Sequence, residues 1–350
     1  IKVEVETLPY GDYFTALQTD LAAGTQADVF DMEYAGYAEY QANGVLAEIT
    51  LSNPGAYRQS VLEAYQTDGK QYAVPSSFSD VVLYYNKDLF DAAGLEYPTN
   101  DWTWEDEKAA AEKLTDQAAG VWGDHQPVSF YEYYKAVAQA GGEFLNEDGT
   151  AVAFNSPEGI KAAEWLVGKS GTVMPTIEQG QGTADFDTNL FKEGKLGMLH
   201  SGIWVFGAFA DVPFNWDIAV EPGDAAQASA VFSNAVGVSS SSKHIEAASK
   251  WVEFLTSSEV MVDLRLDNGW ELPAISDEAK LATYLDKGAP ANRQAVFDSL
   301  DGIALPPIAA KGQTEMQDIV SEELVEAQAG RKTVQEALAS AEERVNAVIG

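Results

Sequence analysis

Strand-like and helix-like segments alternate through the opening third of this sequence, and this alternation restricts the fold more than any other feature. The two-residue hydrophobic period of IKVEVETL predicts a strand, and the helical period of Asp12 to Ala23 predicts a helix. A second strand is expected over Asp28–Met32, followed by a helix that ends at Gly44 and an apolar segment over Val45–Ile49. This order is typical of an α/β protein with a largely parallel sheet.

The rest of the sequence extends the same pattern. The continuous apolar run VVLYYNK predicts a buried strand, which follows a polar loop over Ser76–Asp80. Capping-box patterns predict that helices begin after Thr103, Ser129 and Thr333. Further helices are expected over Lys87–Ala93, Lys243–Thr256, Ser258–Asp267, Thr314–Ala329 and Val334–Ile349, and short strands over Leu196–Leu199 and Ala235–Ser239.

The length of the chain predicts two lobes. Its 350 residues exceed what one hydrophobic core comfortably serves. No long low-complexity linker interrupts the sequence, so the lobes should be joined by short, stiff crossings rather than by a flexible tether. No apolar run approaches the ~20 residues that a membrane-spanning helix needs.

A strongly acidic balance restricts the partners. The sequence holds 21 basic and 55 acidic residues, for a net charge of −34. Such a charge repels phosphate backbones, so no nucleic acid is expected as a partner. The same acidity keeps a protein soluble and also suits a cation-rich or acidic environment, and the composition leaves both explanations open.

Motifs for most kinds of catalysis are missing from the sequence. It has no cysteine, which excludes disulfides, thiol catalysis and cysteine-based metal sites. His125, His200 and His244 lack metal-ligand spacing, so each is expected to be structural or a hydrogen-bonding surface group. No phosphate-binding glycine motif and no nucleophile elbow occur. We therefore expect no catalytic residue, metal or cofactor, although a carboxylate pair acting in glycoside hydrolysis stays open.

One stretch, FKEGKLGMLHSGIW, places an aromatic ring where α/β proteins bind ligands. A short helix closes at Gly194, a strand follows, and a Ser-Gly turn presents Trp204. Other aromatic and acidic residues at or beside the ends of expected elements are Tyr34, Phe78, Tyr131 and Trp270, accompanied by Glu33, Asp80 and Glu271. Aromatic faces stack on sugar rings and carboxylates accept hydrogen bonds from hydroxyls, so these residues favour a carbohydrate cleft.

The order of several motifs resembles one family across nearly the whole chain. The motifs are, in order, DVFDM with GYAEYQANGVLAEI, QYAVP, VVLYYNKDLFDAAGL, DWTWEDE, GGEFLNEDG, FNSPEGIKAAEWL, FKEGKLGMLHSGIW, AVGVSSSSKHIEAASKWVEFLTSSE, NGWELPA and AGRKTVQEALASAEERVNAVI. In this order they resemble the extracellular solute-binding proteins of ATP-driven carbohydrate importers, of the maltose-binding-protein type.

The resemblance implies a two-lobed periplasmic-binding-protein fold of type II, in which helices flank the sheet of each lobe. Three crossings would join the lobes near residues 80–82, 236–238 and 302–307. The N-terminal lobe would then comprise residues 1–80 and 239–303, and the C-terminal lobe residues 81–236 and 308–350.

The resemblance also implies which residues bind the ligand. Trp204 matches the sugar-stacking tryptophan of the C-terminal lobe, and Tyr131 matches its cleft tyrosine. The other positions in sugar-contacting segments are Glu33, Tyr34, Phe78, Ser79, Asp80, Asn234, Trp270 and Glu271.

From the same resemblance we expect a monomeric protein, not an enzyme, that binds an oligosaccharide or other neutral sugar in the interlobe cleft. It would deliver this sugar to the membrane permease of an ATP-driven importer. The family is extracellular or periplasmic, so a lipid anchor on a removed N-terminal segment is expected, and a further strand and helix would precede IKVEVETL. The alternative is a glycoside hydrolase or another sugar-active enzyme that uses a cleft carboxylate pair.

Overall fold

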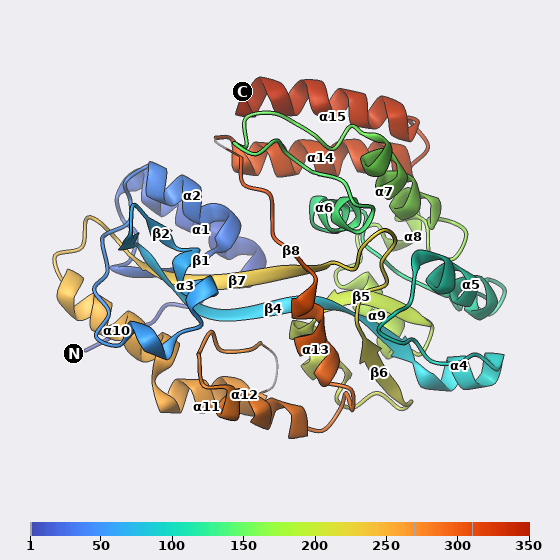
Figure 1. Ribbon diagram of the computed structural model, residues 1–350, viewed down its shortest axis with the longest axis horizontal. Coiled ribbons are helices and arrows are strands. Elements are labelled where there is room, and N and C mark those ends of the chain that lie inside the picture. Colours follow the sequence, from blue (N-terminus) through green and yellow to red (C-terminus); the bar gives the residue numbers. More distant parts are fainter. Residues whose placement is uncertain (1, 269–270, 310) are drawn as a thin grey trace. The chain divides into compact units, whose positions relative to one another are not determined.

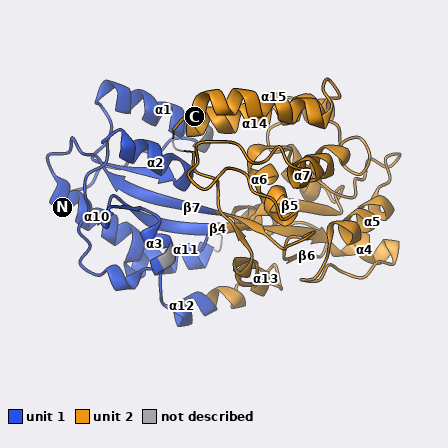
Figure 2. Ribbon diagram, turned by 45° about the horizontal axis from the view of Figure 1, so that its top comes forward, with its two compact units in different colours: residues 1–78, 232–282 blue, residues 79–231, 283–350 orange. Residues whose placement is uncertain are grey.

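The chain divides into two compact units in a computed structural model that describes residues 2–268, 271–309 and 311–350 (Figure 1). Figure 2 shows unit 1, residues 1–78 and 232–282, and unit 2, residues 79–231 and 283–350. The chain passes from one unit to the other inside β4 (Ala73–Asn86), inside β7 (Ser229–Val238) and after α12 (Glu278–Ala282). The lobe boundaries and crossings expected from the sequence stay predictions.

Unit 1 contains the pair formed by β1 (Val29–Glu33) and the second half of β7. The two strands run antiparallel, and Glu33 is the register partner of Asn234. Phe30 and Met32 are buried on one side of β1 with an exposed residue between them, as the two-residue period of a strand requires. The unit also contains α1 (Tyr10–Ala23), α2 (Tyr34–Ala42), η1 (Pro54–Ala56), α3 (Gln59–Glu63), β2 (Gln66–Thr67), β3 (Lys70–Gln71), α10 (Ile245–Ser257) and α11 (Glu259–Asn268).

Unit 2 is built on the second half of β4. The strands β5 (Met198–Gly202) and β6 (Trp216–Ala219) pair antiparallel with β4, and β8 (Ile303–Ala304) pairs parallel with β7. The unit also contains α4 (Lys87–Ala93), α5 (Trp104–Leu114), α6 (Phe130–Gln139), α7 (Pro157–Gly168), α8 (Ile177–Gly180), α9 (Phe186–Lys192), η2 (Ile203–Phe209), η3 (Thr283–Asp286), α13 (Gln294–Asp298), η4 (Ser299–Asp301), α14 (Gln313–Gln328) and α15 (Val334–Ile349).

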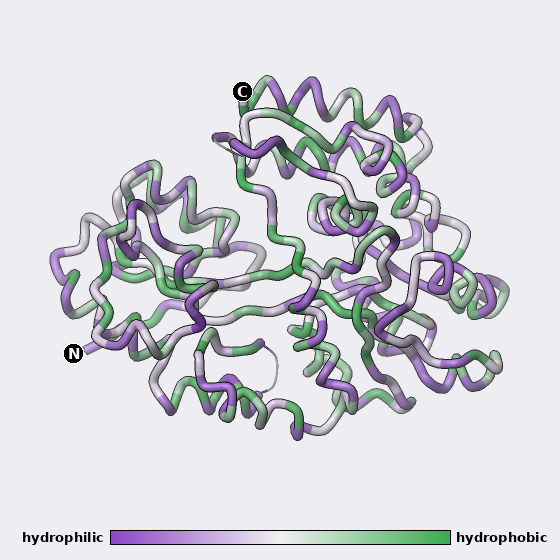
Figure 3. Tube along the Cα trace, viewed as in Figure 1, coloured by the Kyte–Doolittle hydropathy of each residue, from purple (hydrophilic) through white to green (hydrophobic). Residues whose placement is uncertain are grey.

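The helices α14 and α15 pack against each other, and both pack against α7. Figure 3 shows hydrophilic and hydrophobic residues alternating along both helices, as expected of amphipathic helices that bury one face. Val320 and Leu324 of α14 and Ala341 and Val345 of α15 are buried. None of the helices in the described ranges is both long enough and apolar enough to cross a membrane.

Strand direction differs from the expectation. The pairs β1–β7, β4–β5 and β4–β6 are antiparallel, so the prediction of a largely parallel sheet is wrong for them. The alternation of strands and helices indicates an α/β fold, but it does not fix which strands become neighbours.

The segment IKVEVETL was expected to be a strand, but residues 2–8 form none and are exposed. The valines of the apolar alternation, Val3 and Val5, are 37% and 72% exposed. An alternating pattern becomes a strand only when another strand satisfies its backbone groups, and none in the described ranges pairs with this segment.

The expected polar loop over Ser76–Asp80 is also wrong, because these residues lie inside β4. All fourteen residues of β4 are buried. The serines find partners there: Ser76 Oγ donates to the Asn234 carbonyl at 3.1 Å, and Ser77 Oγ donates to Glu271 Oε2 at 2.6 Å. Polar residues can therefore continue a buried strand when each hydroxyl is hydrogen-bonded.

Helix starts were predicted well where the caps are local. Full capping boxes form at Thr103 and Thr333, as predicted. At Ser129 only half of the box forms, because the Glu132 carboxylate binds Gln126 and Lys135 instead of the backbone. The segment expected over Val45–Ile49 contains only an isolated bridge from Leu46 to Ser239.

Candidate functional site

Three of the expected site residues come together in unit 1. Glu33, at the end of β1, is the register partner of Asn234 on β7. Asn234 Nδ2 donates to Glu271 Oε1 at 3.2 Å, and Ser77 Oγ donates to the other carboxylate oxygen at 2.6 Å. A carboxylate held by two neutral donors keeps lone pairs free to accept hydrogen bonds from hydroxyl groups.

A cation beside this group was not expected from the sequence. Arg265 Nη1, on α11, lies 3.8 Å from Glu271 Oε2. Burial lowers the pKa of Arg265, and Glu271 opposes this effect. Ser77 was missed as well, although it precedes the expected Phe78 to Asp80 segment. The sequence signal for Arg265 is a single arginine on a helix just before NGWELPA, which is too weak to select it.

Two other expected residues of unit 1 are chain neighbours of this polar group, since Phe78 follows Ser77 and Tyr34 follows Glu33. Phe78 is buried and forms two backbone hydrogen bonds with Leu272, at 2.9 and 3.0 Å. Tyr34 is half-buried, and its ring meets Tyr65 edge-on at 5.7 Å. Trp270 lies outside the described residues.

Trp204 in unit 2 presents an aromatic face directly after β5. It lies in the first turn of η2 and is 41% exposed. A Cβ atom at Gly202 would lie 1.9 Å from Trp204 Cζ3, so only glycine allows the ring to lie against the backbone here. A helical segment does begin at Trp204, but the expected Ser-Gly turn is wrong, because Ser201 and Gly202 end β5 and pair with Val82 and Val81 of β4.

Tyr131 lies in the first turn of α6, within a cluster of aromatic rings. Its ring centroid lies 5.4 Å from that of Phe130 and 6.4 Å from that of Tyr134, both in edge-to-face geometry. Phe130 and Tyr134 are buried, whereas Tyr131 is half-buried. Its neighbours therefore fix the ring while leaving part of it accessible.

Ser79 and Asp80 follow in β4, and both side chains are buried. Neither carboxylate oxygen of Asp80 has a hydrogen-bond partner among the described residues. Burial raises the pKa of Asp80 well above its usual value. The folded protein therefore favours the protonated carboxyl.

Replacing Asp80 with asparagine should stabilise the protein at high pH. Folding raises the pKa of Asp80, so its contribution to the stability of the folded protein is fully present below about pH 4. This contribution is lost as the pH rises through the pKa that Asp80 has in the folded protein. Asp80→Asn should therefore be more stable than the wild type at pH 8 by about 1–3 kcal/mol, and the gain should shrink toward pH 4. Urea unfolding across this range, with exposed Asp211→Asn as control, measures the difference; a gain independent of pH would contradict the assignment.

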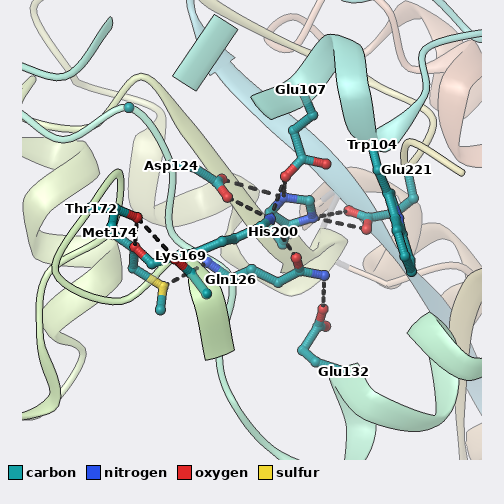
Figure 4. A network of polar contacts seen from close by, with 12 residues as sticks. Trp104, Glu107, Asp124, Gln126, Glu132, Lys169, Thr172, Met174, His200 and Glu221 are labelled. Atoms are coloured by element: carbon teal, nitrogen blue, oxygen red, sulfur yellow. Dashed lines mark hydrogen bonds and ion pairs between the residues drawn. The ribbon is translucent and has the colours of Figure 1, made fainter. Parts of the chain in front are cut away.

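His200 lies at the centre of a buried charged network in unit 2 (Figure 4). Its Nδ1 lies 2.9 Å from Glu221 Oε2. Its Nε2 lies 3.2 Å from Glu107 Oε1 and 3.3 Å from Asp124 Oδ1. Both ring nitrogens face carboxylates, so the ring is an imidazolium that carries a proton on each. Burial alone would lower the pKa of His200, but the three carboxylates raise it well above its usual value.

Lys169 supplies a second cation to the network. Its ammonium donates to Glu107 Oε1, to Asp124 Oδ2 at 2.7 Å and to Gln126 Oε1 at 2.6 Å. Burial would lower the pKa of Lys169, but Asp124 and Glu107 raise it. Conversely, burial would raise the pKa of Asp124, and Lys169 and His200 lower it. Lys169 and Asp124 therefore both stay charged at neutral pH.

Lys135, on α6, supplies the third cation. Its Nζ lies 2.6 Å from Glu132 Oε2 and 2.5 Å from Glu221 Oε2. Glu221 thus binds both Lys135 and His200. Burial would raise the pKa of Glu221, but His200 and Lys135 lower it to about 2.

By distance alone, two sets of side chains in the network could hold a metal ion. The sets are Glu107 with Asp124 and His200, and Glu132 with His200 and Glu221, each with ligand atoms within 4.8 Å of one another. A lysine ammonium already lies on a carboxylate oxygen of each set. A metal ion would have to compete with that ammonium and with the proton of the imidazolium. The contacts are those of an ion-pair network.

Sequence reasoning missed the network because its members are far apart in the chain. His200 lies 21 positions from Glu221 and 93 positions from Glu107. Of the two roles expected for His200, the structural one holds, since the side chain is buried. The one local signal was the i,i+3 pair of Glu132 and Lys135 on α6.

The fold has counterparts among known proteins. A family model described as bacterial extracellular solute-binding protein matches residues 1–262. An ABC substrate-binding protein from Listeria monocytogenes, solved in complex with cycloalternan, is 42% identical, with a TM-score of 0.95 over 99% of this chain and 91% of that chain. The cyclic alpha-maltosyl-1,6-maltose binding protein from Arthrobacter globiformis is 25% identical, with a TM-score of 0.78 over 97% and 89% of the two chains. A probable amino-acid ABC transporter periplasmic-binding protein from Sinorhizobium fredii is 29% identical over 99% of this chain and 82% of its own length.

These matches define the class as two-lobed α/β binding proteins of ABC transporters, and they confirm the expected fold class. The chain belongs to the family of bacterial extracellular solute-binding proteins. This is the family that the order of the motifs predicts.

Proposed function

We propose that this protein binds an oligosaccharide outside the cell and delivers it to the membrane permease of an ATP-driven importer. The observation that carries the proposal is the 42% identity and TM-score of 0.95 to the Listeria protein solved with cycloalternan. The Arthrobacter protein, which is named for a cyclic maltose derivative, supports the same class of ligand.

The proposed ligand contacts have the chemistry that sugars need. In unit 2, the exposed face of Trp204 and the ring of Tyr131 would stack on the apolar C–H patches of sugar rings. In unit 1, Asn234 and Glu271 would exchange hydrogen bonds with hydroxyl groups. The remaining expected contacts, Glu33, Tyr34, Phe78, Ser79, Asp80 and Trp270, stay predictions.

We also propose that the protein acts as a monomer without catalysing a reaction, and that a lipid anchor tethers it to the membrane. Membership in a family of solute-binding proteins supports a binding role rather than an enzymatic one.

An amino acid is the second candidate ligand, because the Sinorhizobium relative is named for one. Its 29% identity supports that candidate less than the 42% identity supports a sugar.

A thermal-shift screen tests the proposal. A ligand that binds only the folded protein stabilises it by about 2.7 kcal/mol when its concentration is a hundred times its Kd. We expect cycloalternan, cyclic maltosyl-maltose or linear maltodextrins to raise the melting temperature. A shift with single amino acids and none with any sugar would favour the second candidate instead.

A further inference from the structure

We propose that the buried network around His200 positions the two aromatic rings of unit 2, Tyr131 and Trp204, for sugar binding, with Glu221 as the positioning residue that joins them. The inference rests on the proposed function, since it assigns a role to groups that would not touch the sugar.

The network holds both elements that carry these rings. Glu132 and Lys135 belong to α6 and follow Tyr131 in the same helix. His200 belongs to β5, and the strand ends at Gly202, two residues before Trp204. Glu132 and Lys135 on α6 and His200 on β5 are all buried.

One carboxylate connects the two elements. Glu221 Oε2 lies 2.5 Å from Lys135 Nζ on α6 and 2.9 Å from His200 Nδ1 on β5. Glu221 follows β6 and belongs to neither element. The distance between α6 and β5 at this level therefore depends on a bridge of two charge-assisted hydrogen bonds.

Charges on every side hold His200 in the form that this bridge needs. Glu107 of α5 and Asp124 face its Nε2, and the ammonium of Lys169 forms an ion pair with each of these carboxylates. A neutral imidazole could not donate to carboxylates through both nitrogens. The imidazolium consequently fixes the ring and the strand that carries it.

The connection from His200 to Trp204 is short and tightly packed. The Gly202 carbonyl accepts a hydrogen bond from the Tyr84 hydroxyl at 2.7 Å, and Ile203 is fully buried. The Trp204 ring lies against Gly202. A shift of β5 at His200 would therefore move the Trp204 ring relative to Tyr131, because this connection has little freedom to absorb it.

The test compares two buried glutamates. Glu221→Gln keeps the size of the side chain and removes the charge that both Lys135 and His200 require. Glu323→Gln is the matched control, because Glu323 on α14 is also buried in unit 2 and binds Lys332 and Arg344, but it bonds to neither α6 nor β5. Sugar affinity is measured by calorimetry, stability by thermal unfolding, and the pKa of His200 by NMR of its imidazole ring.

We expect Glu221→Gln to lower the affinity for the sugar at least tenfold and to lower the pKa of His200. Glu323→Gln should lose stability while keeping both wild-type values. If Glu221→Gln does not fold, Glu221→Asp keeps the charge on a side chain too short to reach both cations, and the same loss of affinity is expected.

Two results would overturn the inference but not the proposed function. One is wild-type sugar affinity in a folded Glu221 variant. The other is an equal loss of sugar affinity in Glu323→Gln, which would show that the network only stabilises the fold. If the wild type itself binds no sugar in the screen, the proposed function fails, and the inference fails with it.

Discussion

Replacing Trp204 with alanine should lower the affinity for the oligosaccharide at least tenfold, which corresponds to about 1.4 kcal/mol. Trp204 is 41% exposed directly after β5, and its ring packs against the backbone of Gly202. Alanine removes the stacking surface, and the exposed position means that the fold loses little. Calorimetric titration of both proteins with the sugar that gives the largest thermal shift measures the difference.

Phe254 provides the matched control for this substitution. It lies on α10 in unit 1 and is 42% exposed, nearly the same fraction as for Trp204. Phe254→Ala should leave the affinity unchanged within a factor of two or so. An unchanged affinity in Trp204→Ala, or an equal loss in both variants, would remove Trp204 from the proposed site.

Replacing Lys169 with methionine should strongly lower the free energy of unfolding. The substitution keeps an unbranched side chain but leaves Glu107 and Asp124 buried without their ammonium partner. Breaking a buried ion pair by removing one partner costs about 3–5 kcal/mol. Urea unfolding followed by tryptophan fluorescence measures the loss.

Lys250→Met is the control for this loss. Lys250 forms an i,i+4 pair with Glu246 on α10, and its side chain is 63% exposed. Exposed pairs contribute at most about 1 kcal/mol, so this variant should unfold close to the wild type. Equal stability of the two variants would show that Lys169 does not form a buried ion pair with Glu107 and Asp124.

The sequence predicted those parts of the fold that depend on neighbouring residues. The helix at residues 334–349 begins and ends as predicted, because Thr333 caps it locally and its apolar stripe repeats at helical spacing. The Ser-Gly pair before Trp204 was wrongly expected to be a turn, because its pairing with the distant strand β4 makes it the end of β5. The family followed from the order of such local motifs.

What the sequence did not predict depends on contacts between distant residues. The strand β4 continues through Ser76 and Ser77 because their hydroxyls donate hydrogen bonds to Asn234 and Glu271. Both acceptors lie more than a hundred positions away in the chain. The buried network brings acids and lysines from separate elements together around His200, and its one local signal, the i,i+3 pair of Glu132 and Lys135, does not reveal the rest. Arg265 beside Glu271 likewise becomes visible only once α11 is placed.

Calorimetric titration of the wild-type protein with cycloalternan, followed by analysis of the recovered sugar, tests the central claim most directly. We expect saturable binding of one sugar per chain and recovery of the intact sugar. Absence of saturable heat with cycloalternan and with linear maltodextrins up to ~1 mM, or recovery of shorter products, would contradict it.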